Sequence, residues 1–99
     1  YVMFLNRANK ALGVSLISKG GMAETVMDVK IILQTALKVH ASGIILSHNH
    51  PSGNLRPSEP DKQITSKIKE ACKYLDLVLL DHIILTDERY YSFTDEGLL

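Results

Sequence analysis

Apolar and polar positions in the first part of the chain follow the pattern of a β-hairpin. Residues 1–5 (YVMFL) are aromatic and apolar, residues 6–10 (NRANK) are turn-like, and Ala11–Ser18 is apolar at alternate positions. A period of two is typical of a β-strand. The alternating apolar side chains are Leu12, Val14 and Leu16. The second strand is predicted to end where Gly20–Gly21 interrupts the pattern.

Two later segments have the spacing of amphipathic helices, in which apolar residues recur every three or four positions. The first is predicted to start at about Thr25 or Asp28 and to end near His40. Its apolar positions are Val29, Ile32, Leu33, Ala36 and Leu37. The second is predicted to start at Ser58. Its apolar face is expected to contain Ile64, Ile68, Ala71, Cys72 and Leu75, which places the cysteine in the core.

Three further segments are predicted to be strands, namely Gly43–Leu46, Leu77–Leu85 and Tyr90–Phe93. The first is short and apolar throughout, which is typical of a central strand that is covered on both faces. A tight turn at residues 86–89 separates the other two. The order strand, strand, helix, strand, helix, strand, strand predicts an α/β fold with a helix on each side of one sheet. No linker or internal repeat divides residues 1–99, so a single domain is expected.

Composition narrows the possible classes of protein. The chain has 99 residues, of which 45% are hydrophobic, and this is enough for a core without cross-links. Lys+Arg and Asp+Glu both total 11, so the net charge is zero and no positive field favours DNA binding. One cysteine excludes an internal disulfide and cysteine-rich zinc sites, as suits a reducing cytosol. No apolar run approaches the roughly 18 residues of a membrane span, so we expect a soluble cytoplasmic protein.

The segment 48–61 (HNHPSGNLRPSEPD) gathers the groups of a metal site. Alternate side chains of a strand lie on one side, about 6.6 Å apart, so His48 and His50 can face one point. Proline, glycine and asparagine between them and the helix favour a turning backbone, which could bring Asp61 back to the strand end. Two imidazoles, one carboxylate and a water are the usual ligands of catalytic zinc. Such zinc lowers the pKa of its water to about 7 and polarises carbonyl groups, so hydrolysis is implied.

Each of these residues also has a simpler interpretation. Ser58 and Asp61 form a capping-box pattern, which needs no metal, and two histidines two positions apart are often only a solvated strand end. Capping uses one lone pair of the Ser58 hydroxyl and leaves its hydrogen free to stabilise an oxyanion. Asp81 and His82 interrupt an apolar strand and must find partners. Structural hydrogen bonds are one explanation, and orientation of a ligand histidine is the other.

Four of these residues carry a family resemblance. His48 and His50 are separated by one residue, Ser58 follows after seven more, and Asp61 follows after two. This spacing matches H-x-H-x7-S-x2-D, the pattern of the JAMM (MPN+) metalloproteases, without insertion or deletion. The resemblance implies a zinc ion on the two histidines and the aspartate, with the serine helping to hold the tetrahedral intermediate.

The sequence around the motif, and two segments further along the chain, are similar to one branch of that superfamily. HNHPSGN at residues 48–54, DHII at 81–84 and YSF at 91–93 look like the bacterial RadC-like proteins, and the resemblance covers nearly the whole chain. It implies a JAB/MPN domain of cytidine-deaminase-like architecture, in which a mixed sheet lies between helices in three layers. It also implies a peptide or protein substrate with a scissile amide.

The family pattern contains one more residue, a glutamate that accepts a proton from the zinc-bound water. In RadC-like proteins we expect it just before the first strand, whereas this chain opens at Tyr1 inside an apolar run, as a domain truncated at its N-terminus would. Glu24 and Glu96 do not occupy the family position. A general base typically contributes about 10² to 10⁴ in rate, so we predict zinc binding without efficient turnover.

Two other classes of function compete with the hydrolase. A DNA-associated role follows from the repair label attached to RadC-like proteins, but the neutral charge gives it no support. A nucleobase deaminase would share zinc and a similar sheet, but it requires H-x-E and P-C-x-x-C, and this chain has a single cysteine. The identity of the substrate and the oligomeric state are left open by the sequence.

Overall fold

The computed structural model describes residues 1–15, 27–50 and 53–99, and the predicted Leu16 and Gly20–Gly21 positions lie outside these ranges. Within these ranges, seven elements form in the predicted order. They are β1 (Val2–Leu5), β2 (Ala11–Ser15), α1 (Val29–Lys38), β3 (Gly43–Asn49), α2 (Glu59–Tyr74), β4 (Val78–Leu85) and β5 (Tyr90–Ser92). The α/β class is therefore confirmed. None of the described helices is long and apolar enough to cross a membrane.

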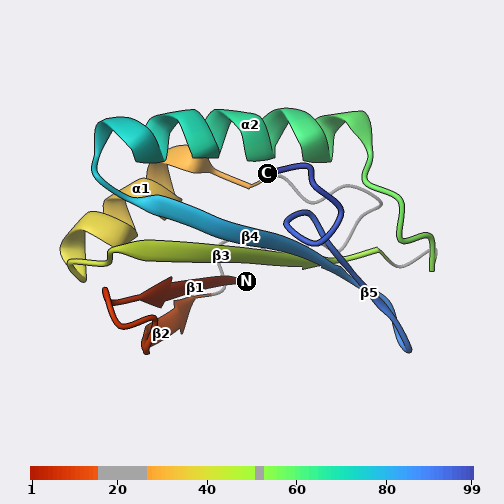
Figure 1. The fold of residues 1–99 in the computed structure, drawn as a ribbon, viewed down its shortest axis with the longest axis horizontal. Coiled ribbons are helices and arrows are strands. Elements are labelled where there is room, and N and C mark those ends of the chain that lie inside the picture. Colours follow the sequence, from red (N-terminus) through yellow and green to blue (C-terminus); the bar gives the residue numbers. More distant parts are fainter. Residues whose placement is uncertain (16–26, 51–52) are drawn as a thin grey trace.

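All five strands belong to one mixed sheet with the order β2-β1-β3-β4-β5 (Figure 1). Neighbouring strands are antiparallel except for β3 and β4, which are parallel. β3 is the central strand and is longer than the apolar run Gly43–Leu46 that predicts it, because its ladder with β4 continues to the pair Asn49 and Leu85. The extension places His48 within the sheet, beside Ile84 of β4.

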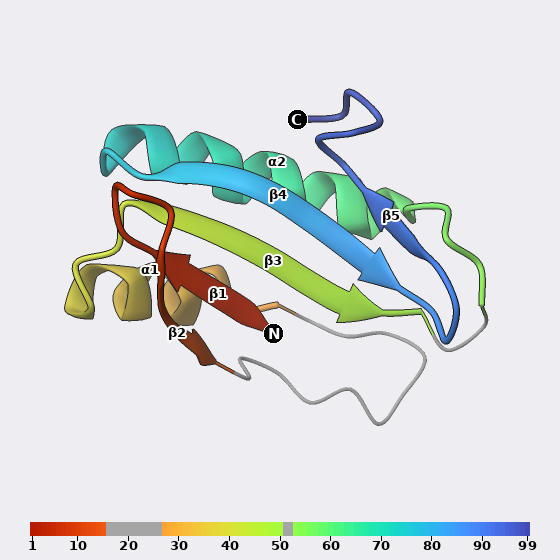
Figure 2. The same ribbon diagram turned by 60° about the horizontal axis from the view of Figure 1, so that its bottom comes forward.

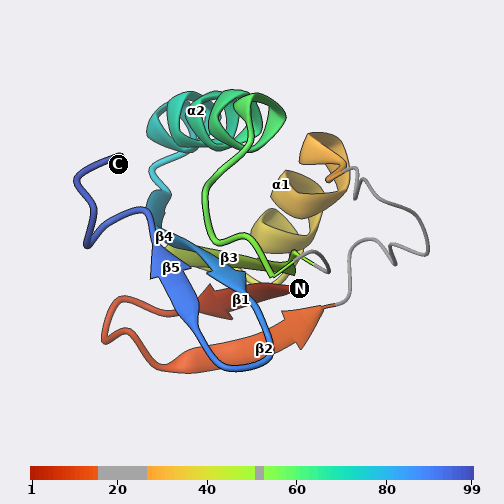
Figure 3. The same cartoon turned by 90° about the vertical axis from the view of Figure 1, so that its right-hand side faces the viewer.

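Both described helices lie on the same face of the sheet, which corrects the expected helix on each side. Figure 2 shows the sheet in front of α1 and α2, and Figure 3 shows both helices above it. The cause is the strand order: the connection from β2 through α1 to β3 and the connection from β3 through α2 to β4 progress across the sheet in the same direction. Because such crossovers between parallel strands are right-handed, they place their helices on one face. The described residues therefore form two layers rather than three.

The hydrophobic core lies between this face and the helices. It joins side chains of β1, β3 and both helices, namely Val2, Phe4, Ile32, Ala36, Ile44, Leu46, Ile68 and Cys72. The expected core position of Cys72 is confirmed, since only 1% of it is exposed. The alternating side chains of β2 do not join this core: Gly13 pairs with Phe4, and Leu12 and Val14 are exposed.

Capping groups explain where the helices begin. Asp28 caps α1 by accepting hydrogen bonds from Lys30 N–H and Ile31 N–H, so the later of the two predicted starts is correct. Ser58 caps α2, as predicted. The buried face of α2 contains Thr65, Ile68 and Cys72. Leu75, which the spacing placed on this face, is exposed because it forms the C-cap, where the helix has already ended.

Candidate metal centre

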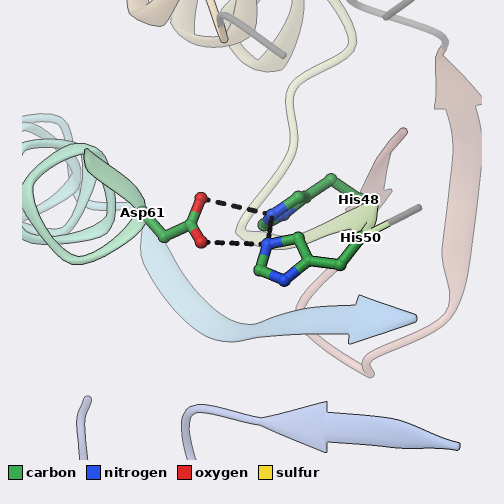
Figure 4. Close-up of side chains that lie close together, drawn as sticks. All are labelled: His48, His50 and Asp61. Carbon is green, nitrogen blue, oxygen red and sulfur yellow. Dashed lines mark hydrogen bonds and ion pairs between the residues drawn. The ribbon is translucent and has the colours of Figure 1, made fainter. Parts of the chain in front are cut away.

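Two elements bring three predicted residues together at the carboxyl end of the central strand (Figure 4). His48 is the residue before the last residue of β3, and His50 directly follows that strand. Asp61 is in the first turn of α2. The three side chains are only 9%, 17% and 16% exposed, respectively. The end of β3 and the start of α2 therefore form one polar site that is largely shielded from solvent.

The potential ligand atoms are at distances that suit a small dication. His48 Nε2 lies 2.9 Å from His50 Nε2 and 3.2 Å from Asp61 Oδ1, and His50 Nε2 lies 3.0 Å from Asp61 Oδ2. Ligands of a tetrahedral zinc ion, each about 2.0–2.1 Å from the metal, lie about 3.3 Å from one another. A small outward movement of the three groups would therefore accommodate zinc, and these residues form a group that could hold a metal.

The contacts on the outer side of the two rings bear on their tautomers. His50 Nδ1 lies 2.7 Å from the main-chain oxygen of Asn54, and a carbonyl only accepts, so this nitrogen carries the hydrogen. His48 Nδ1 lies 2.8 Å from His82 Nε2. If both rings carry their hydrogen on Nδ1, their Nε2 lone pairs face each other and the Asp61 carboxylate. Three acceptors that face one point repel one another, and a cation bound between them would relieve this repulsion.

Asp61 serves the helix cap and the candidate centre at the same time. Its Oδ2 accepts the Ser58 N–H at 2.8 Å, while Ser58 Oγ accepts the Asp61 N–H at 3.1 Å. Its Oδ1 remains directed at His48. The capping box is thus confirmed, and it coexists with the metal-site geometry instead of replacing it. The predicted catalytic role of Ser58 remains a prediction, because its observed contact is the cap.

Burial and hydrogen bonding favour the metal-binding protonation states of His48 and Asp61. Burial lowers the pKa of His48 below its usual value, against the attraction of Asp61. Burial would raise the pKa of the Asp61 carboxyl, but hydrogen bonds with Ser58 and the adjacent imidazoles outweigh it, and this pKa is also lowered. A neutral imidazole and an ionised carboxylate are the forms that coordinate zinc.

Asp81 and His82 have separate roles, although they are neighbours on β4. Asp81 Oδ1 accepts the N–H groups of His82 and Thr94, and its Oδ2 accepts the Ser92 hydroxyl. These bonds connect β4 to β5 and to Thr94 just after it, so the structural interpretation of Asp81 is correct. His82 is fully buried and its ring points toward the candidate centre, where it contacts His48. Burial, and then the nearby His48 ring, lower the pKa of His82 to about 4.

Sequence reasoning missed Thr65, a buried residue behind the ligands. Its hydroxyl donates to the main-chain oxygen of Asp61 at 2.7 Å and contacts His82 Nδ1. A signal was available, because Thr65 is one helical turn after Asp61 and lies in line with Ile68 on the buried face. A polar residue in such a stripe requires a buried partner.

An open pocket of about 550 Å³ is formed by residues that flank Ser58 and Asp61 in sequence together with two residues from the last part of the chain. It is lined by Leu55, Arg56, Pro57, Lys62, Tyr91 and Leu98. Arg56 and Pro57 precede the capping serine, and Lys62 directly follows Asp61. The pocket combines apolar and cationic side chains.

The fold and the candidate centre define an α/β domain of the JAB type, with a His-x-His pair on a central strand and an aspartate on the following helix. The family model of the RadC-like JAB domain matches residues 1–98, and the chain belongs to this family. The resemblance inferred from the motif is thereby confirmed.

Curated relatives cover the chain almost completely. It is 52% identical over 98 residues to a UPF0758 protein of Flavobacterium johnsoniae, with 99% of this chain and 43% of that protein covered. A UPF0758 protein of Porphyromonas gingivalis is 46% identical, with 100% and 44% covered, and one of Aquifex aeolicus is 40% identical, with 98% and 42% covered. The chain therefore spans less than half the length of these relatives.

Proposed function

We propose that this domain is the zinc-dependent hydrolase part of a longer RadC-like protein and that it cleaves an amide bond in a peptide or protein. The convergence of two imidazole nitrogens and one carboxylate, within 4.8 Å of one another, carries this proposal. His48, His50 and Asp61 would hold the zinc. The ion would supply a hydroxide near neutral pH and would polarise the scissile carbonyl.

The remaining chemistry falls to groups around the ligands. The Ser58 hydroxyl keeps its hydrogen, since it acts as an acceptor in the cap, and this hydrogen would stabilise the oxyanion. No glutamate of the chain is assigned as general base: Glu24 lies outside the described residues, and Glu96 is exposed beyond β5. We place the base in the longer protein. This chain is expected to bind zinc while turning over substrate poorly.

The net charge of zero favours a protein substrate over DNA. A polyanion is bound mainly through neutralisation of its phosphates, and this chain has no excess of cations to supply. A single buried cysteine and a zinc site built without thiolates both suit the reducing cytoplasm, where we propose that the protein acts.

Zinc titration of the metal-free chain tests the centre. We expect about one zinc per chain, and loss of that zinc in His48→Ala and in Asp61→Ala. His40→Ala is the matched control, because His40 follows α1, is exposed and belongs to no metal-binding group of the described residues. Zinc retention by both ligand variants would refute the assignment.

Activity is tested on the longer protein and on this chain in parallel, with peptide and isopeptide substrates. The longer protein is expected to hydrolyse an amide in a zinc-dependent way, and Ser58→Ala is expected to lower kcat more than KM. The chain alone is expected to lack the roughly 10²- to 10⁴-fold contribution of a general base. Equal rates for the two would contradict the placement of the base outside this chain.

A further inference from the structure

A continuous series of hydrogen bonds runs behind the candidate centre, from the main chain of Asp61 through two buried side chains to His48. Thr65 Oγ1 lies 2.7 Å from the Asp61 main-chain oxygen and within hydrogen-bond distance of His82 Nδ1. His82 Nε2 in turn lies 2.8 Å from His48 Nδ1. Thr65 is 2% exposed and His82 is not exposed at all, so no solvent competes for these bonds.

The direction of each hydrogen bond in this series follows from its first member. A main-chain carbonyl can only accept, so the single hydroxyl hydrogen of Thr65 is directed to Asp61. The side of Thr65 Oγ1 that faces His82 is therefore a lone pair, and His82 must carry a hydrogen on Nδ1. In the neutral ring, Nε2 is then an acceptor, and the hydrogen between the two rings belongs to His48 Nδ1.

The orientation of the His82 ring is also restrained by packing. It stacks on Phe93, with ring centroids 4.7 Å apart and an interplanar angle of 12°. Hydrogen bonds at both nitrogens and an aromatic face leave the ring no equivalent flipped position, because a flip would remove both nitrogens from their partners. His82 is therefore a rigid acceptor for His48.

We propose that Thr65 and His82 are positioning residues that hold His48 in the one tautomer whose Nε2 lone pair faces the metal. The proposal rests on the proposed metal centre and goes beyond it, because it names the residues that fix the tautomer of His48 before metal binds. The series of hydrogen bonds starts and ends at Asp61. Its main-chain oxygen sets the direction of the hydrogens, and its Oδ1 lies 3.2 Å from His48 Nε2, the nitrogen left with a free lone pair. Partners behind a ligand histidine typically contribute 10- to 100-fold in metal affinity.

The substitution Thr65→Val tests this proposal, since valine has nearly the same shape but no hydroxyl. We expect zinc affinity to fall roughly 10- to 100-fold in Thr65→Val, and to stay close to the original in Thr65→Ser, which keeps the hydroxyl. Thr35→Val is the matched control, because the Thr35 hydroxyl makes the same bond to a main-chain oxygen one turn earlier, to Ile31 at 2.8 Å in α1, with no histidine attached. His82→Phe, which can still stack on Phe93, is expected to weaken zinc binding at least as much as Thr65→Val.

Imidazole nitrogen NMR shifts of the metal-free chain provide a readout that needs neither zinc nor activity. We expect His48 protonated at Nδ1 and bare at Nε2, and a change of this ratio in Thr65→Val. A hydrogen on His48 Nε2 in the unsubstituted chain, or unchanged zinc affinity in a folded Thr65→Val, would overturn the proposal. If the tautomer is as stated but the unsubstituted chain does not bind zinc, the positioning of His48 holds and the proposed function fails.

Discussion

Two substitutions of Asp61 separate its part in the helix cap from its part in the metal centre. Asp61 Oδ2 accepts the Ser58 N–H at 2.8 Å, and Asp61 Oδ1 lies 3.2 Å from His48 Nε2. Asparagine keeps one carbonyl oxygen that can accept the Ser58 N–H, but it removes the negative charge. Alanine removes the acceptor and the charge together. The difference between the two variants therefore measures the cap, and their common effect measures the charged ligand.

In the metal-free chain, Asp61→Ala is expected to lower the free energy of unfolding by about 1–2 kcal/mol. This sum contains about 1 kcal/mol for the capping hydrogen bond and about 0.3–1 kcal/mol for a negative charge in the first turn of a helix. Asp61→Asn loses only the second contribution, about 0.3–1 kcal/mol. The carboxyl pKa is lowered, so the charge is present at neutral pH. Urea denaturation of the chelator-treated proteins provides these values.

Zinc affinity is expected to fall by more than about 100-fold in both variants, beyond the 10- to 100-fold loss that removal of an outer partner causes. Competition with a chromophoric chelator measures it. Zinc at about 100 times its dissociation constant would also stabilise the unsubstituted chain by about 2.7 kcal/mol, and neither variant by a comparable amount. Unchanged zinc affinity in Asp61→Asn would show that the carboxylate is not a ligand. Equal stability of the two metal-free variants would show that the cap contributes nothing.

Two predictions concern the core on which the centre rests. Ile68→Ala is expected to lower the free energy of unfolding by about 2–5 kcal/mol, because Ile68 is fully buried, whereas the exposed Lys67→Ala should change it by less than about 0.5 kcal/mol in urea denaturation. Burial raises the pKa of the Cys72 thiol, so the protonated form is favoured in the folded state and stability should decline as pH rises above the ordinary thiol pKa of about 8.5. Alkylation of the native chain at neutral pH should accordingly be much slower than alkylation in urea, and equal rates would contradict this.

Local periodicity was sufficient to predict the elements but not their ends. The apolar run Gly43–Leu46 identified the central strand, since four consecutive apolar residues suit a buried position. The strand nevertheless continues to Asn49, because pairing with β4 supplies main-chain hydrogen bonds whatever the side chains are. The two histidines depend on that continuation for their position, so the part of β3 that apolar patterning does not predict is the part that forms the candidate centre.

The placement of the helices could not be predicted from patterning, because it depends on the order of strands in the sheet. An amphipathic helix reports that one of its faces is buried and says nothing about which side of a sheet buries it. Here β1 lies between β2 and β3, so the chain crosses the sheet twice in the same direction and both helices share a face. The common layer allows α2 to pack against β4, where Thr65 contacts His82.

The ligands of the candidate centre can be predicted from their spacing in the sequence, whereas the orientation of His48 requires the three-dimensional structure. His48, His50 and Asp61 occur within fourteen residues, so their chemistry is visible in the sequence. The tautomer of His48 depends on His82, 34 residues away. No local pattern identifies that partner.

Because Asp61 is shared by the cap, the ligand set and the hydrogen-bond chain behind His48, folding and metal binding at this site are coupled. Formation of the first turn of α2 places the carboxylate, through the Ser58 bond, and at the same time places the main-chain oxygen that orients Thr65. A cation bound between β3 and α2 would neutralise three facing acceptors and would join the helix start to the strand end. The fold should therefore orient the ligands before metal binds, and metal should stabilise the first turn of α2 more than α1, which contributes no ligand.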